Sequence, residues 1–304
     1  MPDKEVTVLL STYNGAQYIG EQLNSIIKQK KVVVKILIRD DGSTDNTLNI
    51  IRSYQEKYDF IKLIEGENLG SCESFFCLME YANRHYQQKY YAFSDQDDFW
   101  EEDKLFNAIF SIGQFNSPCL YCSNLKIVDR DLEFQKLMYE TRPIIKKNDS
   151  LLNNFATGCT TVINRELLEL FCSLKRPKSV VMHDWWLYCL ANYFGTVIYD
   201  NNAHILYRQH GSNVYGARML TNLEKLKNFI NSIFHPYNQH YREDTAKAFL
   251  ECTSHLLASN DRKIIERIAL YRQSLIKRCI LALDFVNFRK LSIKIRLRIL
   301  LGLI

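Results

Sequence analysis

Four consecutive residues, Asp95, Gln96, Asp97 and Asp98, place three carboxylates directly after a short apolar run. Carboxylates this close repel one another unless a cation neutralises them, and oxygen ligands of this kind suit Mg²⁺ or Mn²⁺. Such an ion can bridge the phosphates of a nucleotide and take up charge on a departing diphosphate. The alternative is a solvated acidic turn before the next helix, and these four residues alone favour neither interpretation.

A second polar segment, Asp40-Asp-Gly-Ser-Thr-Asp45, follows an apolar run at 32–38. Gly42 suits a tight turn, and Thr44 or Asp45 can cap the next helix. These roles leave Asp40 and Asp41 unexplained, and a carboxylate there can accept the imide N–H of a uracil or thymine ring. The sequence holds neither a GxGxxG motif nor a P-loop, which argues against a dinucleotide enzyme or an NTPase.

Asp184 stands between His183 and a pair of tryptophans, Trp185 and Trp186, at the expected start of a helix. As a structural residue, Asp184 would stabilise the helix N-terminus while the tryptophans fill the core. As a functional residue, it would be a general base beside an aromatic surface on which a sugar can stack. Both interpretations stay open on these residues alone.

The segment at 207–213, Tyr-Arg-Gln-His-Gly-Ser-Asn, follows a strand-like run and is rich in hydrogen-bond donors. Arg208 is suited to binding a diphosphate because its guanidinium matches phosphate geometry. His210 can bind a metal or a phosphate, although a single histidine is more often structural.

The elements expected around these groups alternate between strands and helices. Apolar runs predict buried strands at 6–10, 32–38, 61–64 and 90–93, and helical periodicity appears near 19–27, 48–54 and 71–85. That order predicts βαβ units in an α/β fold with a mostly parallel sheet. The polar segments 11–15, 40–45 and 95–98 then meet at the carboxyl edge of that sheet, where ligands bind.

Beyond residue 100 the pattern is less regular. It predicts a helix at 101–112, strands at 120–128 and 155–163, helices at 164–173 and 183–193, and paired strands at 195–199 and 204–208. Gly158 is expected at a close approach of two segments, and Asn164 is expected to cap a helix. From 217 onward only helical periodicity remains.

Composition limits the class of protein. With 304 residues, 47% of them hydrophobic, the chain is a folded protein of one large domain or one domain with an appendage. The net charge of +5 is too small to indicate a nucleic-acid partner. The chain opens directly into a strand without a secretion signal, so we expect its nine cysteines to be free thiols in a cytoplasm.

Taken in order, these segments closely resemble the family 2 glycosyltransferases with the GT-A fold. The matching segments lie at 11–15, 40–45, 68–70, 94–100, 183–186 and 207–213. The forms SDQDDFW, MHDWW and YRQHGSNV resemble bacterial rhamnosyltransferases that build cell-wall or capsular polysaccharides. The QxxRW motif and spanning helices of the family's processive synthases are missing, so we expect an enzyme that adds one or a few sugars.

The resemblance implies an inverting, metal-dependent transfer from a nucleoside diphosphate sugar, dTDP-rhamnose in preference, to a lipid-linked glycan. Position by position, it implies Asp184 as the catalytic base; Thr12, Tyr13, Asn14, Asp41, Asp95, Asp97 and Arg208 in the nucleotide site; His183, Trp185 and Trp186 at the acceptor; and Asp97, Asp98 and His210 as ligands of Mg²⁺ or Mn²⁺. Two alternatives stay open: the same chemistry with a UDP-hexose donor, and a non-catalytic partner subunit that binds nucleotide or glycan.

The domains follow from the extent of the resemblance and from charge. We expect a catalytic domain at 1–215, with a nucleotide-sugar half to about residue 100 and an acceptor half beyond it. A helical basic region is expected at 216–304, because residues 262–304 carry eleven basic residues against two acidic ones.

One helix of the basic region is predicted to be amphipathic, with Leu291, Ile295, Ile299 and Leu300 on one face. Such a face would meet anionic lipid headgroups, or would pack on the catalytic domain or a second subunit of a homo-oligomer. We therefore expect a cytoplasmic protein, peripheral at the inner face of the cell membrane.

Overall fold

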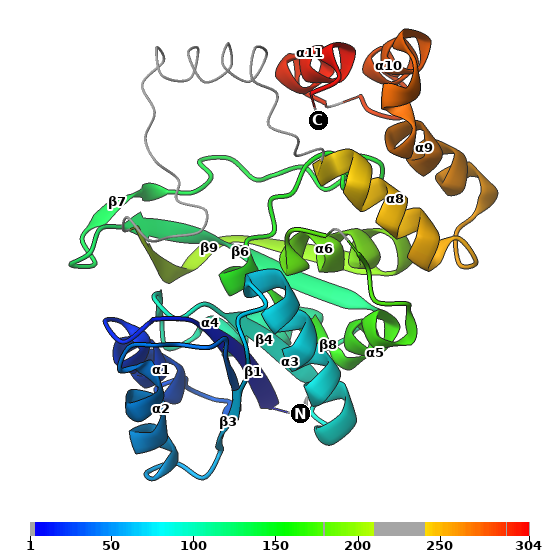
Figure 1. Ribbon diagram of the computed structural model, residues 1–304. Helices are drawn as coiled ribbons and strands as arrows, with labels where there is room; N and C mark the ends of the chain where they lie inside the picture. Colours follow the sequence, from blue (N-terminus) through cyan, green and yellow to red (C-terminus); the bar gives the residue numbers. More distant parts are fainter. Residues whose placement is uncertain (1–3, 179, 210–240, 290, 304) are drawn as a thin grey trace. The chain divides into compact units, whose positions relative to one another are not determined.

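The structure is a computed structural model that describes residues 4–178, 180–209, 241–289 and 291–303 (Figure 1). The chain divides into two compact units. The first holds Met1–Ile144, Phe155–Ser173 and Met182–Val214, and the second holds Ile145–Asn154, Leu174–Val181 and Tyr215–Ile304. The expected domain boundary at residue 215 lies outside the described residues.

A nine-stranded mixed sheet with flanking helices forms the first unit, in the order β3-β2-β1-β4-β8-β6-β9-β5, with β7 paired to β6. Its first half is parallel and consists of β1 (Glu5–Thr12), β2 (Val33–Asp40), β3 (Ile61–Glu65) and β4 (Tyr90–Ser94). The helices α1 (Ile19–Ile27), α2 (Thr47–Gln55) and α3 (Ser71–His85) connect these strands. The predicted βαβ units are therefore confirmed.

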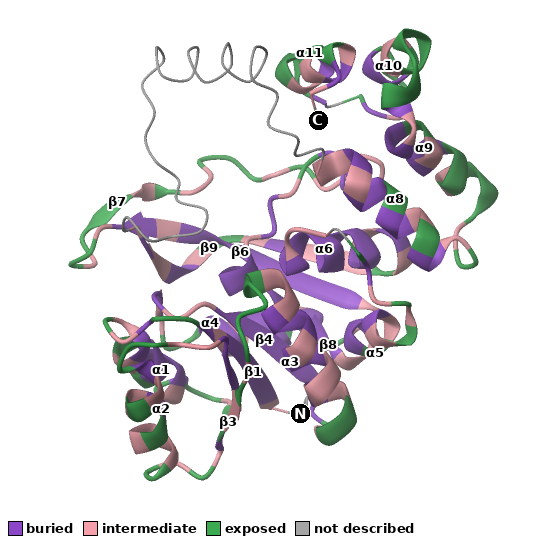
Figure 2. Ribbon diagram, in the orientation of Figure 1, coloured by how far each residue is buried: buried purple, intermediate pink, exposed green. Residues whose placement is uncertain are grey.

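Much of this half is buried, and Figure 2 shows β1 and β4 in purple. The predicted apolar runs account for this, since Val8 and Leu9 of β1 and Phe93 of β4 are completely buried. Each side chain of this size stabilises the fold by about 1.5–3 kcal/mol when it leaves water. The polar residues that follow each strand are held on this rigid base.

The second half of the sheet is less parallel than predicted. It contains β5 (Phe99–Trp100), β6 (Cys119–Val128), β7 (Phe134–Leu137), β8 (Val162–Asn164) and β9 (Thr196–Arg208), with helices α4 (Lys104–Ile112), α5 (Arg165–Ser173) and α6 (His183–Phe194). The short strand β8 runs antiparallel to both β4 and β6, whereas β9 is parallel to β6. The sheet is thus mixed.

Two predicted elements are corrected. The predicted strand at 155–163 is mostly loop, with one 3₁₀ turn, η1 (Gly158–Thr160), before β8. The two strands predicted at 195–199 and 204–208 form one strand, β9, because both ends pair with β6 across a shift of register near Asn124. Asn164 does cap α5, since its Oδ1 accepts from Leu167 N–H at 3.2 Å.

From Tyr241 onward the described part of the second unit is helical, as predicted, with α8 (Tyr241–Thr253), α9 (Ser259–Ala269), η2 (Tyr271–Gln273), α10 (Leu275–Ala282) and α11 (Ile293–Leu301). Among the described helices, none is both long and apolar enough to cross a membrane. On the face predicted to meet lipid or to pack on protein, Ile299 is completely buried and Leu291 is 8% exposed, so these two residues pack on protein.

Candidate active site

The loops after β1 and β4 are joined through Gln96. Its Oε1 accepts from the Thr12 hydroxyl at 2.7 Å and from Tyr13 N–H at 2.8 Å. Its Nε2 donates to the Tyr13 carbonyl at 3.1 Å. Thr12 is buried, whereas Tyr13 is 45% exposed. The main chain of the first loop is therefore fixed while the aromatic ring of Tyr13 stays open to a ligand.

Asn14 joins the first loop to the loop after β2. Its N–H donates to Ser43 Oγ, and its Oδ1 accepts from Thr44 N–H, both at 2.8 Å. Asn14 has a φ of +48°, a left-handed conformation that asparagine tolerates better than most residues. The predicted meeting of the three polar loops at the carboxyl edge of the sheet is confirmed.

Asp40 and Asp41 already hold protein donors. Asp40 accepts from Ser43 N–H at 2.8 Å. Asp41 accepts from Leu69 N–H and Gly70 N–H, and it pairs with the guanidinium of Arg39. A carboxylate has about four acceptor positions, and these donors make four contacts with Asp41, because Leu69 N–H is shared between its two oxygens. These contacts also attach the Asn68–Gly70 segment to the site.

The three carboxylates that follow β4 act on one another. Partial burial raises the pKa of Asp95 to about 7, and the charges of Asp97 and Asp184 add to the rise. Burial and the charges of Asp97 and Asp95 raise the pKa of Asp98 well above its usual value, although the nearby Cys159 and Arg208 N–H oppose the rise. Asp98 Oδ2 has no hydrogen-bond partner among the described residues. A divalent cation would relieve this repulsion.

Two further residues lie beside Asp98 and were not singled out from the sequence. The ligand atoms of Asp95, Asp98 and Cys159 lie within 4.8 Å of one another, and Asp97 is not in this group. Burial raises the pKa of Cys159 and keeps it a thiol. Burial also lowers the pKa of Lys104 to about 7, and its Nζ lies 3.4 Å from the Trp100 ring centroid. Only the tertiary fold brings these two residues to Asp98.

Asp184 lies in the first turn of α6 and is 4% exposed. Its charge raises the pKa of Asp95, so the expected base is near the acidic cluster. A Cβ on Gly158 would lie 3.1 Å from His183 Nε2 and 3.5 Å from Asp184 Oδ2, which confirms the predicted close approach. His183 stacks on Phe75 with ring centroids 3.9 Å apart, and burial lowers its pKa to about 3.

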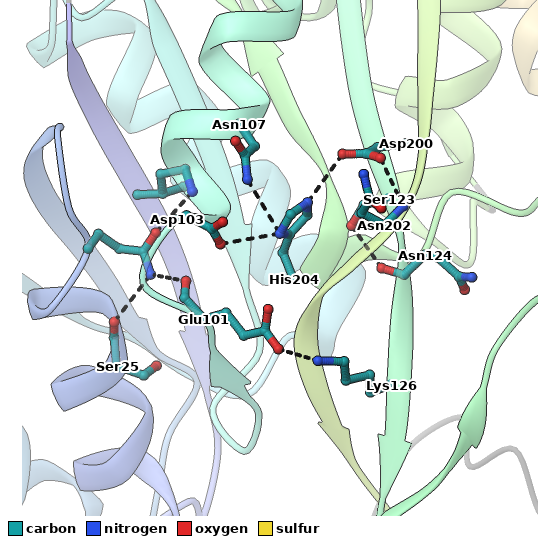
Figure 3. Close-up of polar contacts among 12 residues, drawn as sticks. Ser25, Glu101, Asp103, Asn107, Ser123, Asn124, Lys126, Asp200, Asn202 and His204 are labelled. Atoms are coloured by element: carbon teal, nitrogen blue, oxygen red, sulfur yellow. Dashed lines mark hydrogen bonds and ion pairs between the residues drawn. The ribbon is translucent and has the colours of Figure 1, made fainter.

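A second group of possible ligands, Glu101, Asp103 and His204, is occupied by protein contacts (Figure 3). His204 lies between two carboxylates. Its Nδ1 is 3.3 Å from Asp103 Oδ1, and its Nε2 is 3.2 Å from Asp200 Oδ2. Glu101 pairs with Lys126. This group joins β9 to the segment before α4, and we assign it a structural role.

Comparison with known proteins identifies the family. The sequence profile of Glycosyl transferase family 2 matches residues 7–171. The chain belongs to this family. It is 35% identical over 221 residues to the dTDP-rhamnosyl transferase RfbG of Shigella flexneri, an alignment that covers 69% of this chain and 74% of that protein. The chain is therefore a glycosyltransferase.

More distant family 2 relatives differ in their substrates. The chain is 29% identical over 178 residues to WfgD of Escherichia coli, a UDP-Glc:alpha-D-GlcNAc-diphosphoundecaprenol beta-1,3-glucosyltransferase. That alignment covers 56% of this chain and 64% of WfgD, so the chain spans less than two thirds of that relative's length.

Solved glycosyltransferases share the fold. The structure matches Staphylococcus aureus TarS, solved with UDP-GlcNAc, with a TM-score of 0.57 and 17% identity over 95% of this chain and 77% of that one. It also matches the mannosyltransferase PcManGT of Pyrobaculum calidifontis, with a TM-score of 0.51 and 17% identity over 99% of this chain and 89% of that one. The expected GT-A architecture is confirmed.

Within this family 2 enzyme, other expected site residues are occupied by protein contacts. Arg208 is 3% exposed, and its guanidinium donates to the carbonyls of Asp97 and Arg130 and pairs with Glu21. Trp186 is completely buried, which favours a core role over contact with an acceptor. Diphosphate binding by Arg208 and acceptor binding by His183, Trp185 and Trp186 stay predictions. His210 lies outside the described residues.

Proposed function

We propose that the chain is an inverting, metal-dependent rhamnosyltransferase that transfers L-rhamnose from dTDP-rhamnose to a lipid-linked glycan. The observation that carries this proposal is the position of Asp184, whose charge acts on Asp95 at the carboxyl edge of β4. Inverting transfer needs a base near the cluster that receives the donor's diphosphate. The identity with the Shigella dTDP-rhamnosyl transferase supports the choice of sugar.

The nucleoside binds at the loops after β1 and β2. Tyr13 offers an exposed ring on which a base can stack, and Asp41 is the proposed acceptor for the imide N–H of thymine, which would replace one of its present donors. The full set of nucleotide-binding residues is Thr12, Tyr13, Asn14, Asp41, Asp95, Asp97 and Arg208.

The donor's diphosphate lies at the acidic cluster. Asp97 and Asp98, with His210, would hold Mg²⁺ or Mn²⁺. The unpartnered Oδ2 of Asp98 and the mutual repulsion of the carboxylates support this assignment. When bound, the ion neutralises charge on the departing diphosphate. The Pyrobaculum mannosyltransferase, which has the same fold, was solved with GDP-Man and Mn²⁺.

Asp184 removes the proton from an acceptor hydroxyl. The freed oxygen attacks the anomeric carbon, the bond from that carbon to the diphosphate oxygen breaks, and the configuration inverts. His183 and Trp185 line the acceptor side, and the completely buried Trp186 packs in the core. Burial keeps His183 neutral, so it leaves Asp184 as the group that holds the proton.

The acceptor is a glycan on a lipid carrier, which places the reaction at the inner face of the cell membrane with the enzyme bound peripherally. The name of WfgD, whose acceptor is alpha-D-GlcNAc-diphosphoundecaprenol, supports this assignment. The same name favours one alternative, a UDP-hexose donor used with the same residues and mechanism.

Titration calorimetry in the presence of Mn²⁺ separates the two donors. We expect dTDP and dTDP-rhamnose to bind more tightly than UDP or GDP. Asp98→Ala should abolish the metal-dependent part of binding, whereas Asp184→Asn should keep nucleotide affinity and lower kcat roughly 10³-fold. Preference for UDP would reject the rhamnose assignment and favour the alternative, and absence of nucleotide binding would reject the proposal as a whole.

A further inference from the structure

Two stripes of large apolar side chains are exposed on α10 and α11. On α10 and at its C-cap, Ile276, Ile280 and Leu283 recur at helical spacing and are 72%, 50% and 62% exposed. On α11, residues 293, 297 and 301 form a second stripe of Ile, Leu and Leu that is 46% exposed or more. Figure 2 shows green over much of both helices. Proteins seldom expose this much apolar surface unless it binds something.

The segment between the two helices extends the exposed surface. Phe285 is 57% exposed and Val286 is 90% exposed. Arg296 of α11 holds this segment to both helices, because its guanidinium donates to the carbonyls of Ala282 and Phe288. The Cζ atom of Arg296 also lies 3.9 Å from the centroid of the Phe285 ring. The stripes therefore belong to a preformed helix pair.

The charge around these stripes is strongly positive. Residues 271–304 carry eight basic residues and one acidic residue, Asp284, which is paired with Arg267. Among the basic residues, Lys277 and Lys294 are exposed on the same two helices, whereas Arg272 precedes α10 and pairs with Glu243. An apolar surface with a cationic surround matches a bilayer that contains anionic lipid, since the apolar side chains enter the acyl boundary while the cations meet the headgroups.

A second copy of the chain fits this surface less well. A symmetric dimer places the same patch of both subunits face to face, so the basic residues of one copy would lie against those of the other. Like charges brought together in this way oppose association. Anionic lipid has the opposite charge.

We propose that the exposed residues of α10, α11 and the segment between them form a docking surface for an anionic lipid bilayer. The inference rests on the proposed function, because a lipid-linked acceptor requires the enzyme to work at a membrane. The proposed membrane contact lies on another face than the one predicted from the sequence. Leu291 and Ile299 of the predicted face are buried, whereas Ile276 and Leu297 are exposed.

Flotation of the full chain with vesicles tests this surface. We expect binding to vesicles of phosphatidylcholine with phosphatidylglycerol, weaker binding at high salt, and little binding to phosphatidylcholine alone. The double variant Ile276→Glu, Leu297→Glu should lower vesicle binding at least roughly tenfold. Phe110→Glu is the matched control, because Phe110 is 73% exposed on α4, and it should bind like the wild type.

Equal vesicle binding by the double variant and the control would overturn the proposal. The proposal would also be overturned if the wild-type chain did not bind vesicles but self-associated in sedimentation, while the double variant stayed monomeric. Vesicle binding needs no donor sugar, so its failure contradicts the docking surface alone. Failure of nucleotide binding contradicts the proposed function alone, and dTDP affinity is therefore measured on the same samples.

Discussion

The hydroxyl of Thr12 donates to the side-chain oxygen of Gln96 at 2.7 Å, which joins the end of β1 to the loop after β4. The same amide oxygen accepts from Tyr13 N–H, and the amide nitrogen donates to the Tyr13 carbonyl. One side chain thus sets the spacing between the loop proposed to hold the nucleoside and the loop proposed to hold the diphosphate.

Loss of this side chain should weaken donor binding. We expect Gln96→Ala to raise the donor KM roughly tenfold and to change kcat far less, because hydrogen bonds worth about 1 kcal/mol each are lost from the binding loops. Steady-state kinetics measures both constants. Asn49→Ala is the control, since this exposed amide contacts Asn46 on α2, and equal KM values in the two variants would refute the role of Gln96.

Arg208 is expected to stabilise the first unit. Arg208→Lys should lower the free energy of unfolding by about 2–4 kcal/mol, because a lysine cannot reproduce the donors that reach Asp97, Arg130 and Glu21. Urea unfolding followed by tryptophan fluorescence reports this unit, which holds all three tryptophans.

The control for Arg208 is Arg262→Lys, which alters an exposed pair with Glu266 and should change stability by less than about 0.5 kcal/mol. If Arg208→Lys instead keeps the stability of the wild type, the structural role of the guanidinium is rejected.

His183 should make stability depend on pH. Its folded pKa is lowered to about 3 by burial, from 6.5 in the unfolded chain, so between these values only the unfolded chain takes up the proton. The free energy of unfolding therefore decreases as the pH falls from 6.5 towards 3, and this group contributes up to about 1.4 kcal/mol per pH unit. Urea unfolding at several pH values should give a shallower slope for His183→Asn than for the wild type. Identical slopes would contradict a buried, neutral His183.

Gly158 should be required for the position of Asp184. Gly158→Ala places a methyl group 3.1 Å from His183 Nε2, so the His183 ring must shift, and the adjacent Asp184, whose Oδ2 would lie 3.5 Å from the same methyl group, is expected to shift with it. We expect kcat to fall roughly tenfold at an unchanged donor KM. Gly20→Ala is the control, because its methyl group would lie 3.6 Å from the Tyr54 hydroxyl, an ordinary contact on α1. An unchanged kcat in Gly158→Ala would remove Asp184 from the catalytic account.

The first half of the fold could be predicted because its signals are local. Strands such as β1 are buried on both faces, so they appear as continuous apolar runs, and the loop at each carboxyl end is polar. The second half depends on distant pairing. The polar residues Asp200, Asn201 and Asn202 resemble a turn, yet they lie within β9 because β6 supplies a partner along most of the strand.

The residues of the candidate site differ in the same respect, since some have a local signal in the sequence and others do not. Asp95, Asp98 and Asp184 could be proposed from residue type and from the rule that ligands bind at carboxyl ends. The positions of Cys159 and Lys104 beside Asp98 could not, since the residues around them in the sequence give no signal that either one meets Asp98. Likewise, nothing near Arg208 in the sequence indicates its pairing with Glu21.

Release of free nucleoside diphosphate from competing donors tests the central claim most directly. Purified enzyme with Mn²⁺ and a membrane lipid extract is given dTDP-rhamnose, UDP-glucose or GDP-mannose, beside Asp184→Asn. The account predicts that dTDP is released fastest and that Asp184→Asn lowers this rate roughly 10³-fold. Faster release of UDP, or release of dTDP that Asp184→Asn leaves unchanged, would contradict it.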